Sequence, residues 1–63
     1  MNSSKAMSLQ EGAKVSHGND ILQLVAPPEM VNLDGVPVVR LTTVDDFFRT
    51  RIVCHNEVQL VKE

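Results

Sequence analysis

Two short runs of β-prone apolar residues flank a polar pair in the middle of residues 30–39. The pair is Asp34-Gly35, and both residues tolerate the positive φ that a type I′ turn requires. The pattern therefore predicts a β-hairpin. Pro37 has no amide hydrogen to donate to a ladder. We expect the second strand to be an edge strand, or to leave the nitrogen side of position 37 unpaired.

After this hairpin the spacing of apolar residues changes from every second residue, as in a strand, to about every 3.6 residues, as in a helix. Val44, Phe47 and Phe48 follow the i, i+3, i+4 spacing of one helix face. Thr42 would cap this helix through its hydroxyl, and the Asp45 carboxylate would lie in the first turn, where its charge suits the helix dipole. The two phenylalanines are the only aromatic residues in the chain. We expect them to anchor the core, with a surface binding site as the alternative.

The other segments predict less regular structure. Residues 1–19 are polar with isolated apolar positions, which indicates a disordered arm before a domain of residues 20–63. Residues 21–25 are expected to form a strand, or one capped helical turn, that the double proline ends. Residues 52–61 fit either a second hairpin or a helix that begins near Cys54. The predicted fold class is α+β, a small β-hairpin packed on one or two short helices.

Length and cysteine content limit how such a domain is stabilised. A chain of 63 residues buries only roughly 60% of the surface that its unfolded form exposes. Cys54 is the single cysteine, so no disulfide forms within the chain, and a lone thiol fits a reducing cytoplasm. The N-terminus is polar and the apolar runs are short, which favours a cytoplasmic protein without a membrane partner. Because the core is thin, we expect a homodimer.

Few residues carry reactive chemistry. The nitrogen and sulfur ligands are His17, Cys54 and His55, whereas a structural zinc site uses four ligands. Cys54 and His55 are sequence neighbours, whose side chains point apart in a strand or a helix. Asp45 and Asp46 are explained by helix capping. We therefore expect no metal, no cofactor and no enzymatic activity.

Charge gives a mixed indication about nucleic acid. Six Lys and Arg face eight Asp and Glu, and the net charge of −2 is not typical of a DNA-binding domain. Arg49 and Arg51 nevertheless form a local basic spot. These two side chains could contact phosphate, and the alternative is a solvated loop after a helix.

The predicted order of hairpin, capped helix, basic turn and second helix resembles the N-terminal part of Rha-type phage regulatory and antirepressor proteins. The residues that carry the resemblance are 31–39, then 42–48, then His55 to Val58. The resemblance implies that His55 to Val58 opens a recognition helix. It favours helix over hairpin for residues 52–61.

The resemblance implies a small regulatory protein, phage-encoded, that binds DNA or a transcription-related partner such as a host regulatory protein. Arg49 and Arg51 would then contact phosphates, while His55, Asn56 and Gln59 would face bases. Asn and Gln suit adenine edges. The alternative is a protein-binding module or inhibitor with no nucleic-acid role, which would use an exposed sheet edge or the N-terminal arm. The acidic net charge favours this alternative.

Overall fold

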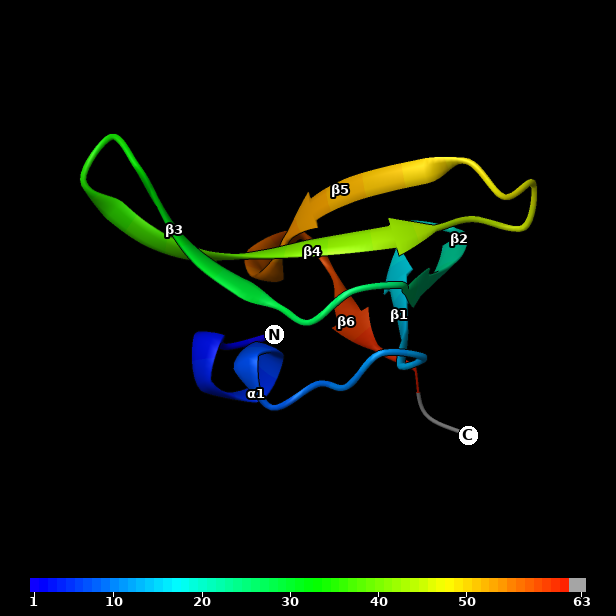
Figure 1. The fold of residues 1–63 in the computed structure, drawn as a ribbon, viewed down its shortest axis with the longest axis horizontal. Helices are drawn as coiled ribbons and strands as arrows, with labels where there is room; N and C mark the ends of the chain where they lie inside the picture. Colours follow the sequence, from blue (N-terminus) through cyan, green and yellow to red (C-terminus); the bar gives the residue numbers. More distant parts are fainter. Residues whose placement is uncertain (62–63) are drawn as a thin grey trace.

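The structure is a computed structural model that describes residues 1–61 (Figure 1). Strands dominate it, and its helical residues lie in two short elements. The predicted α+β fold, a hairpin packed on one or two helices, is therefore wrong. In chain order the elements are α1 (Ser3–Met7), β1 (Lys14–His17), β2 (Asp20–Leu24), β3 (Glu29–Leu33), β4 (Val36–Val44), β5 (Thr50–Cys54), the 3-10 helix η1 (His55–Glu57) and β6 (Gln59–Leu60).

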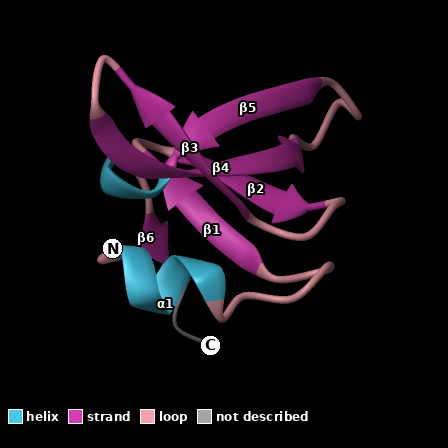
Figure 2. Cartoon of the chain, turned by 60° about the vertical axis from the view of Figure 1, so that its left-hand side comes forward, coloured by secondary structure: helices cyan, strands magenta, loops and turns pink. Residues whose placement is uncertain are grey.

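The long strand β4 organises an antiparallel sheet. One edge of β4 pairs with β3 along residues 36–40 and with β2 at residues 43 and 44. β5 pairs with residues 40–44 along the opposite edge. β1 pairs with β2, and β6 pairs with β1, so among the described residues β3, β5 and β6 each pair along one edge only. Figure 2 shows that the sheet curls into a half-barrel. α1 contacts β4 and η1.

A proline pair breaks one strand of the sheet into β2 and β3. The Val25 N–H donates to the Thr42 oxygen at 3.0 Å, which is the last bond on the β2 side. Pro27 and Pro28 cannot donate to the ladder. Pairing with β4 resumes at Glu29, opposite Arg40. β2 and β3 therefore act as two halves of one bent strand, and the interruption helps the sheet to curl.

The N-terminal residues differ from the expected disordered arm. Ala6 in α1 is fully buried, and Met1 and Leu9 pack against the core. Val15 in β1 is also fully buried. These apolar residues are isolated in sequence because each fills a separate gap on the inner face of the sheet. The core cluster consists of Ala6, Val15, Leu22, Leu24, Val39, Leu41, Val53 and Val58.

Two local predictions are confirmed. The segment at residues 21–25 is a strand, β2. The hairpin is formed by β3 and β4, and Asp34 and Gly35 have φ values of 51° and 83°, as a type I′ turn requires. Pro37 pairs with Asn32 before β5 joins the other edge of β4, so its nitrogen side meets no strand in the part of the chain that the structure describes.

The predicted helix at residues 42–48 is wrong. Thr42, Thr43 and Val44 extend β4, because strands on both of its edges pair with this β-branched run. The Thr43 hydroxyl donates to the Arg51 oxygen at 2.6 Å. Asp45 starts a hairpin turn instead of a helical turn.

The helix expected from residue 54 is also wrong. Ile52 to Cys54 belong to β5, three residues form η1, and the chain then returns to the sheet as β6. The hairpin alternative predicted two strands within residues 52–61, and the end of β5 and the whole of β6 do lie there. However, β6 pairs with β1 and not with β5.

Candidate functional site

The turn between β4 and β5 is organised by one carboxylate. Oδ1 of Asp45 accepts hydrogen bonds from the backbone N–H of Phe47 at 2.9 Å and of Arg49 at 3.0 Å. The backbone of Asp45 closes the same turn, donating to the Arg49 oxygen at 3.1 Å and accepting from the Phe48 N–H at 3.0 Å. These bonds define a three-residue hairpin loop that has a type I turn and then a left-handed residue. We call residues 45–49 the aromatic turn.

Both phenylalanines of the aromatic turn face solvent. Phe47 is 76% exposed and Phe48 is 89% exposed, so the expectation that they anchor the core is wrong. Phe48 has φ of 60°. Glycine is the residue that usually takes this loop position, and a bulky side chain there is rare. The turn therefore displays an aromatic ring at the expense of backbone strain, with little burial to offset it.

Ion pairs of Asp45 with Arg49 and Arg51 stabilise the aromatic turn. The Asp45 side chain is only 7% exposed, and its Oδ2 lies 3.0 Å from Nε of Arg49 and 3.8 Å from a guanidinium nitrogen of Arg51. Desolvation raises the pKa of Asp45, but the backbone N–H groups of Arg49 and Phe47 and the Arg49 guanidinium outweigh it, so the pKa is lowered. The Arg49 guanidinium also lies 5.1 Å from the centre of the Phe47 ring, within cation–π range.

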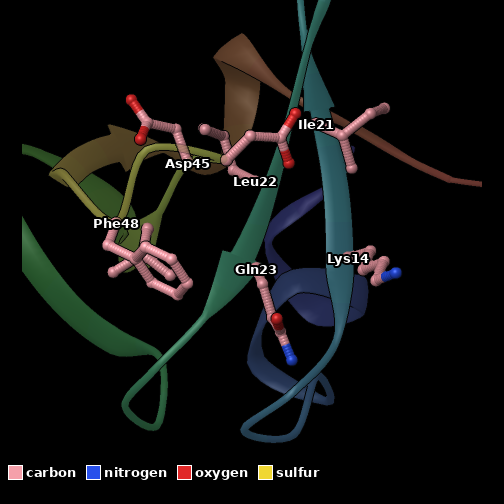
Figure 3. Close-up of a pocket in the computed structure, with 8 residues that line it drawn as sticks. Lys14, Ile21, Leu22, Gln23, Asp45 and Phe48 are labelled. Atoms are coloured by element: carbon pink, nitrogen blue, oxygen red, sulfur yellow. The ribbon is translucent and has the colours of Figure 1, made fainter.

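A depression of about 240 Å³ lies beside the aromatic turn (Figure 3). Figure 3 shows Phe48 on one side of it and Ile21 on the other. Small-molecule sites usually occupy roughly 300–1,000 Å³, so this depression is better suited to one side chain of a partner. It is lined by Lys14, Ile21, Leu22, Gln23, Val44, Asp45, Asp46 and Phe48.

Beside the depression, on the outer side of the sheet, apolar side chains are interspersed with the polar side chains of Gln23, Thr42 and Thr50. Gln23 pairs with Val44, and Thr42 pairs with Ile52, so alternate residues of β2, β4 and β5 share this side. Ile52 is 62% exposed. Apolar side chains that gather on one exposed face are typical of interaction sites. We call the following residues the outer apolar face: Ile21, Val25, Val44, Phe48 and Ile52.

The structure does not gather the five residues predicted to bind DNA. Arg49 and Arg51 lie at the turn end of β5 and pair with Asp45, and Arg51 also lies 3.8 Å from Asp20. The other three residues follow the far end of β5. Nδ1 of His55 accepts a hydrogen bond from the Val39 N–H at 3.0 Å, which gives it a structural role. The remaining two, in η1 and β6, are exposed: Asn56 and Gln59.

Other candidate chemistry is sparse in residues 1–61. No three His, Cys, Asp or Glu side chains of this range come together as a metal site. His17 approaches Glu57, with 3.7 Å between Nε2 and the carboxylate, and Cys54 is a half-buried free thiol. No helix within this range is long and apolar enough to cross a membrane.

Comparison with known proteins finds no matching family model, no matching curated protein and no matching solved structure. The likeness to Rha-type proteins therefore stays a prediction.

One signal in the sequence points to the aromatic turn. Asp45-Asp46 follows a β-branched run, and an aspartate after a strand typically begins a turn. Two adjacent phenylalanines also cannot both face the inner side of one strand. These features suit a hairpin tip at Phe47 and Phe48, but the choice between helix and hairpin is made by the pairing of β4 with β2 and β5.

Proposed function

We propose that this chain is a small protein-binding module whose contact surface is the aromatic turn together with the outer apolar face. One observation carries the proposal: the only two aromatic side chains are exposed on an ordered turn, one of them in a strained conformation. Aromatic residues are over-represented among the residues that dominate binding energy. Strained backbone also clusters at functional sites.

The aromatic turn is suited to binding because it is ordered before a partner arrives. Asp45 fixes the backbone on both sides of the rings through the two amide bonds to its Oδ1. A preorganised contact loses less conformational freedom on binding than a flexible one. Burying a phenylalanine releases about 1.5–3 kcal/mol. Phe47 and Phe48 together therefore offer about 3–6 kcal/mol toward the cost of association, and the rest of the binding energy has to come from the surface around them.

The outer apolar face extends this anchor along the sheet. The depression next to Phe48 can receive one apolar side chain of the partner, and Ile52 can contact the next residues. A protein surface or an extended peptide with alternating apolar residues fits this face. A transcription-related protein remains compatible with it as the partner.

DNA binding stays a prediction with less support. Arg49 and Arg51 would have to leave Asp45 before they could pair with phosphate. The helix that was expected to present His55, Asn56 and Gln59 together is a strand end, η1 and β6. The net charge of −2 also disfavours approach to a polyanion.

A displayed library of random peptides, selected on the immobilised protein, tests the proposal. We expect the selected peptides to be apolar and to lose at least about tenfold in affinity for Phe48→Gly or Phe47→Ser. Leu33→Ser is the matched control: Leu33 is 54% exposed beside the turn between β3 and β4, so this variant should leave affinity unchanged. Peptides that bind all three variants equally would refute the proposal. A parallel titration with generic duplex DNA at two salt concentrations tests the competing prediction.

A further inference from the structure

The outer edge of β5 is open. Among residues 1–61, β5 pairs with β4 alone. Thr42 directs its carbonyl toward Val25 on the β2 side, so its neighbour Thr43 directs its backbone groups toward Arg51 in β5. In an antiparallel ladder this direction alternates along each strand. The residues of β5 whose N–H and C=O groups point away from β4 are therefore Thr50, Ile52 and Cys54.

This edge lacks the features that usually protect a sheet edge. Prolines, lysines, bulges and very short strands block the addition of another strand. β6 has only two residues, and β3, which among the described residues also pairs on one edge only, begins directly after Pro27-Pro28 with Glu29 in an ion pair with Arg40. β5 has five residues and contains neither proline nor lysine. Its one charged side chain, Arg51, lies 3.8 Å from both Asp20 and Asp45, while Ile52 stands exposed at the centre.

We propose that a second copy of this chain pairs with β5 along this edge, with the two β5 strands antiparallel and Ile52 opposite Ile52. The two sheets then become one continuous sheet across a two-fold axis. Two-fold dimers are the commonest homo-oligomers, and the same surface serves both copies. This inference goes beyond the proposed function and does not depend on it.

Register and charge favour a second copy as the occupant. Pairing centred on Ile52 uses all five residues of β5 and places Arg51 opposite Val53 of the second copy. A shift by one residue pair toward the aromatic turn would place Arg51 opposite Arg51, and like charges directly opposite destabilise a strand pair. A shift the other way would lose the pairing of Thr50. The edge is therefore self-complementary in one register.

The dimer also extends the surface that each copy buries. About six backbone hydrogen bonds form between the three outward-pointing residues of each strand. The exposed Ile52 side chains meet across the axis and carry the outer apolar face from one copy to the next. Such pairing supplements the thin core of a small domain.

Disulfide mapping tests the pairing and its register together. In Ile52→Cys combined with Cys54→Ser, the two thiols lie on opposite strands with a Cα separation of about 5.5 Å, within the disulfide range. Mild oxidation should convert most of this variant to a covalent dimer. Thr50→Cys combined with Cys54→Ser is the matched control and should stay monomeric on denaturing gels. Thr50→Cys alone keeps the native Cys54, which lies opposite position 50, and should cross-link.

Sedimentation of the unmodified chain provides the second measurement. We expect a dimer that Ile52→Pro dissociates, since the Ile52 N–H points to the open edge and its loss spares the bonds to β4. A chain that stays monomeric at high concentration overturns the proposal. So does equal cross-linking of the Ile52→Cys variant and its Thr50→Cys control, which would indicate random collision. Phe48→Gly should leave the cross-linking unchanged, so this test and the peptide test fail independently.

Discussion

Replacing Phe48 with glycine should stabilise the fold, although it removes an aromatic ring. A non-glycine residue in the left-handed region costs about 1–2 kcal/mol, and Phe48 has φ of 60°. Glycine loses about 0.5–1 kcal/mol more conformational entropy on folding. The ring is 89% exposed, so its removal gives up little burial. The expected net gain is about 0.5–1 kcal/mol, which corresponds to a rise in Tm of about 2–8 °C.

Two control variants separate the backbone from the side chain. Positive φ among the described non-glycine residues occurs at Asp34 and Phe48, and Phe47 is outside this group. Phe47→Gly therefore relieves no strain and should destabilise the fold by about 0.5–1 kcal/mol. Phe48→Ala removes the ring but keeps Cβ, so its stability should stay close to that of the original chain.

Thermal and urea unfolding followed by circular dichroism measure these differences directly. The reasoning is refuted if Phe48→Gly lowers the unfolding midpoint as much as Phe47→Gly does. That result would mean that the Phe48 ring stabilises the fold by packing on the sheet. Its position would then need no functional explanation. A variant that is more stable and also binds selected peptides less well would instead show that the aromatic ring is retained for contact with a partner.

Three further predictions concern other parts of the molecule. Gly35→Val should lower the free energy of unfolding by about 1–2 kcal/mol, because Gly35 has φ of 83° and an added Cβ has no atom of the described residues within 4 Å, so the cost is conformational. Ala6→Asp should unfold the domain in thermal melts, since it buries an unpaired charge, whereas Met7→Asp, one residue on and 43% exposed, should be tolerated. The interactions that lower the pKa of Asp45 stabilise the fold at pH values above its ordinary pKa of 3.8, and this stabilisation is lost as the pH falls through the pKa of the folded state. Asp45→Asn should therefore lose less stability than the original chain when both are titrated with acid.

Local chemistry decided the parts of the fold that could be predicted. The Asp34-Gly35 turn needs only its own two residues to be recognised, so the hairpin that it joins follows from the sequence. The turn between β1 and β2 is equally local. Gly18 has φ of 61° at the first turn position, and His17 pairs with Asp20. This glycine was an available signal for the first hairpin, and the polar composition around it concealed the strands.

Long-range pairing decided what could not be predicted. A carboxylate that accepts backbone N–H groups serves equally at a helix start and at a hairpin turn, so Asp45 is ambiguous by itself. The choice is made by β2 and β5, which pair with Thr43 and Val44 from both sides. In the same way, β6 gains its strand conformation from β1, far away in the chain. The exposure of the aromatic rings follows from these pairings and not from the residues around them.

The shortness of β6 has a consequence for how the protein opens. Two residues, Gln59 and Leu60, cover the outer edge of β1 opposite Ser16 and Val15. A strand this short is among the first elements to detach in local unfolding. Its detachment costs much less free energy than global unfolding. Each detachment would uncover the backbone of β1 and admit water to the core beside Val15. The amide hydrogen of Ser16, which points toward β6, should therefore exchange with solvent sooner than those of Leu41 and Thr43, which β5 holds on the opposite side of the half-barrel.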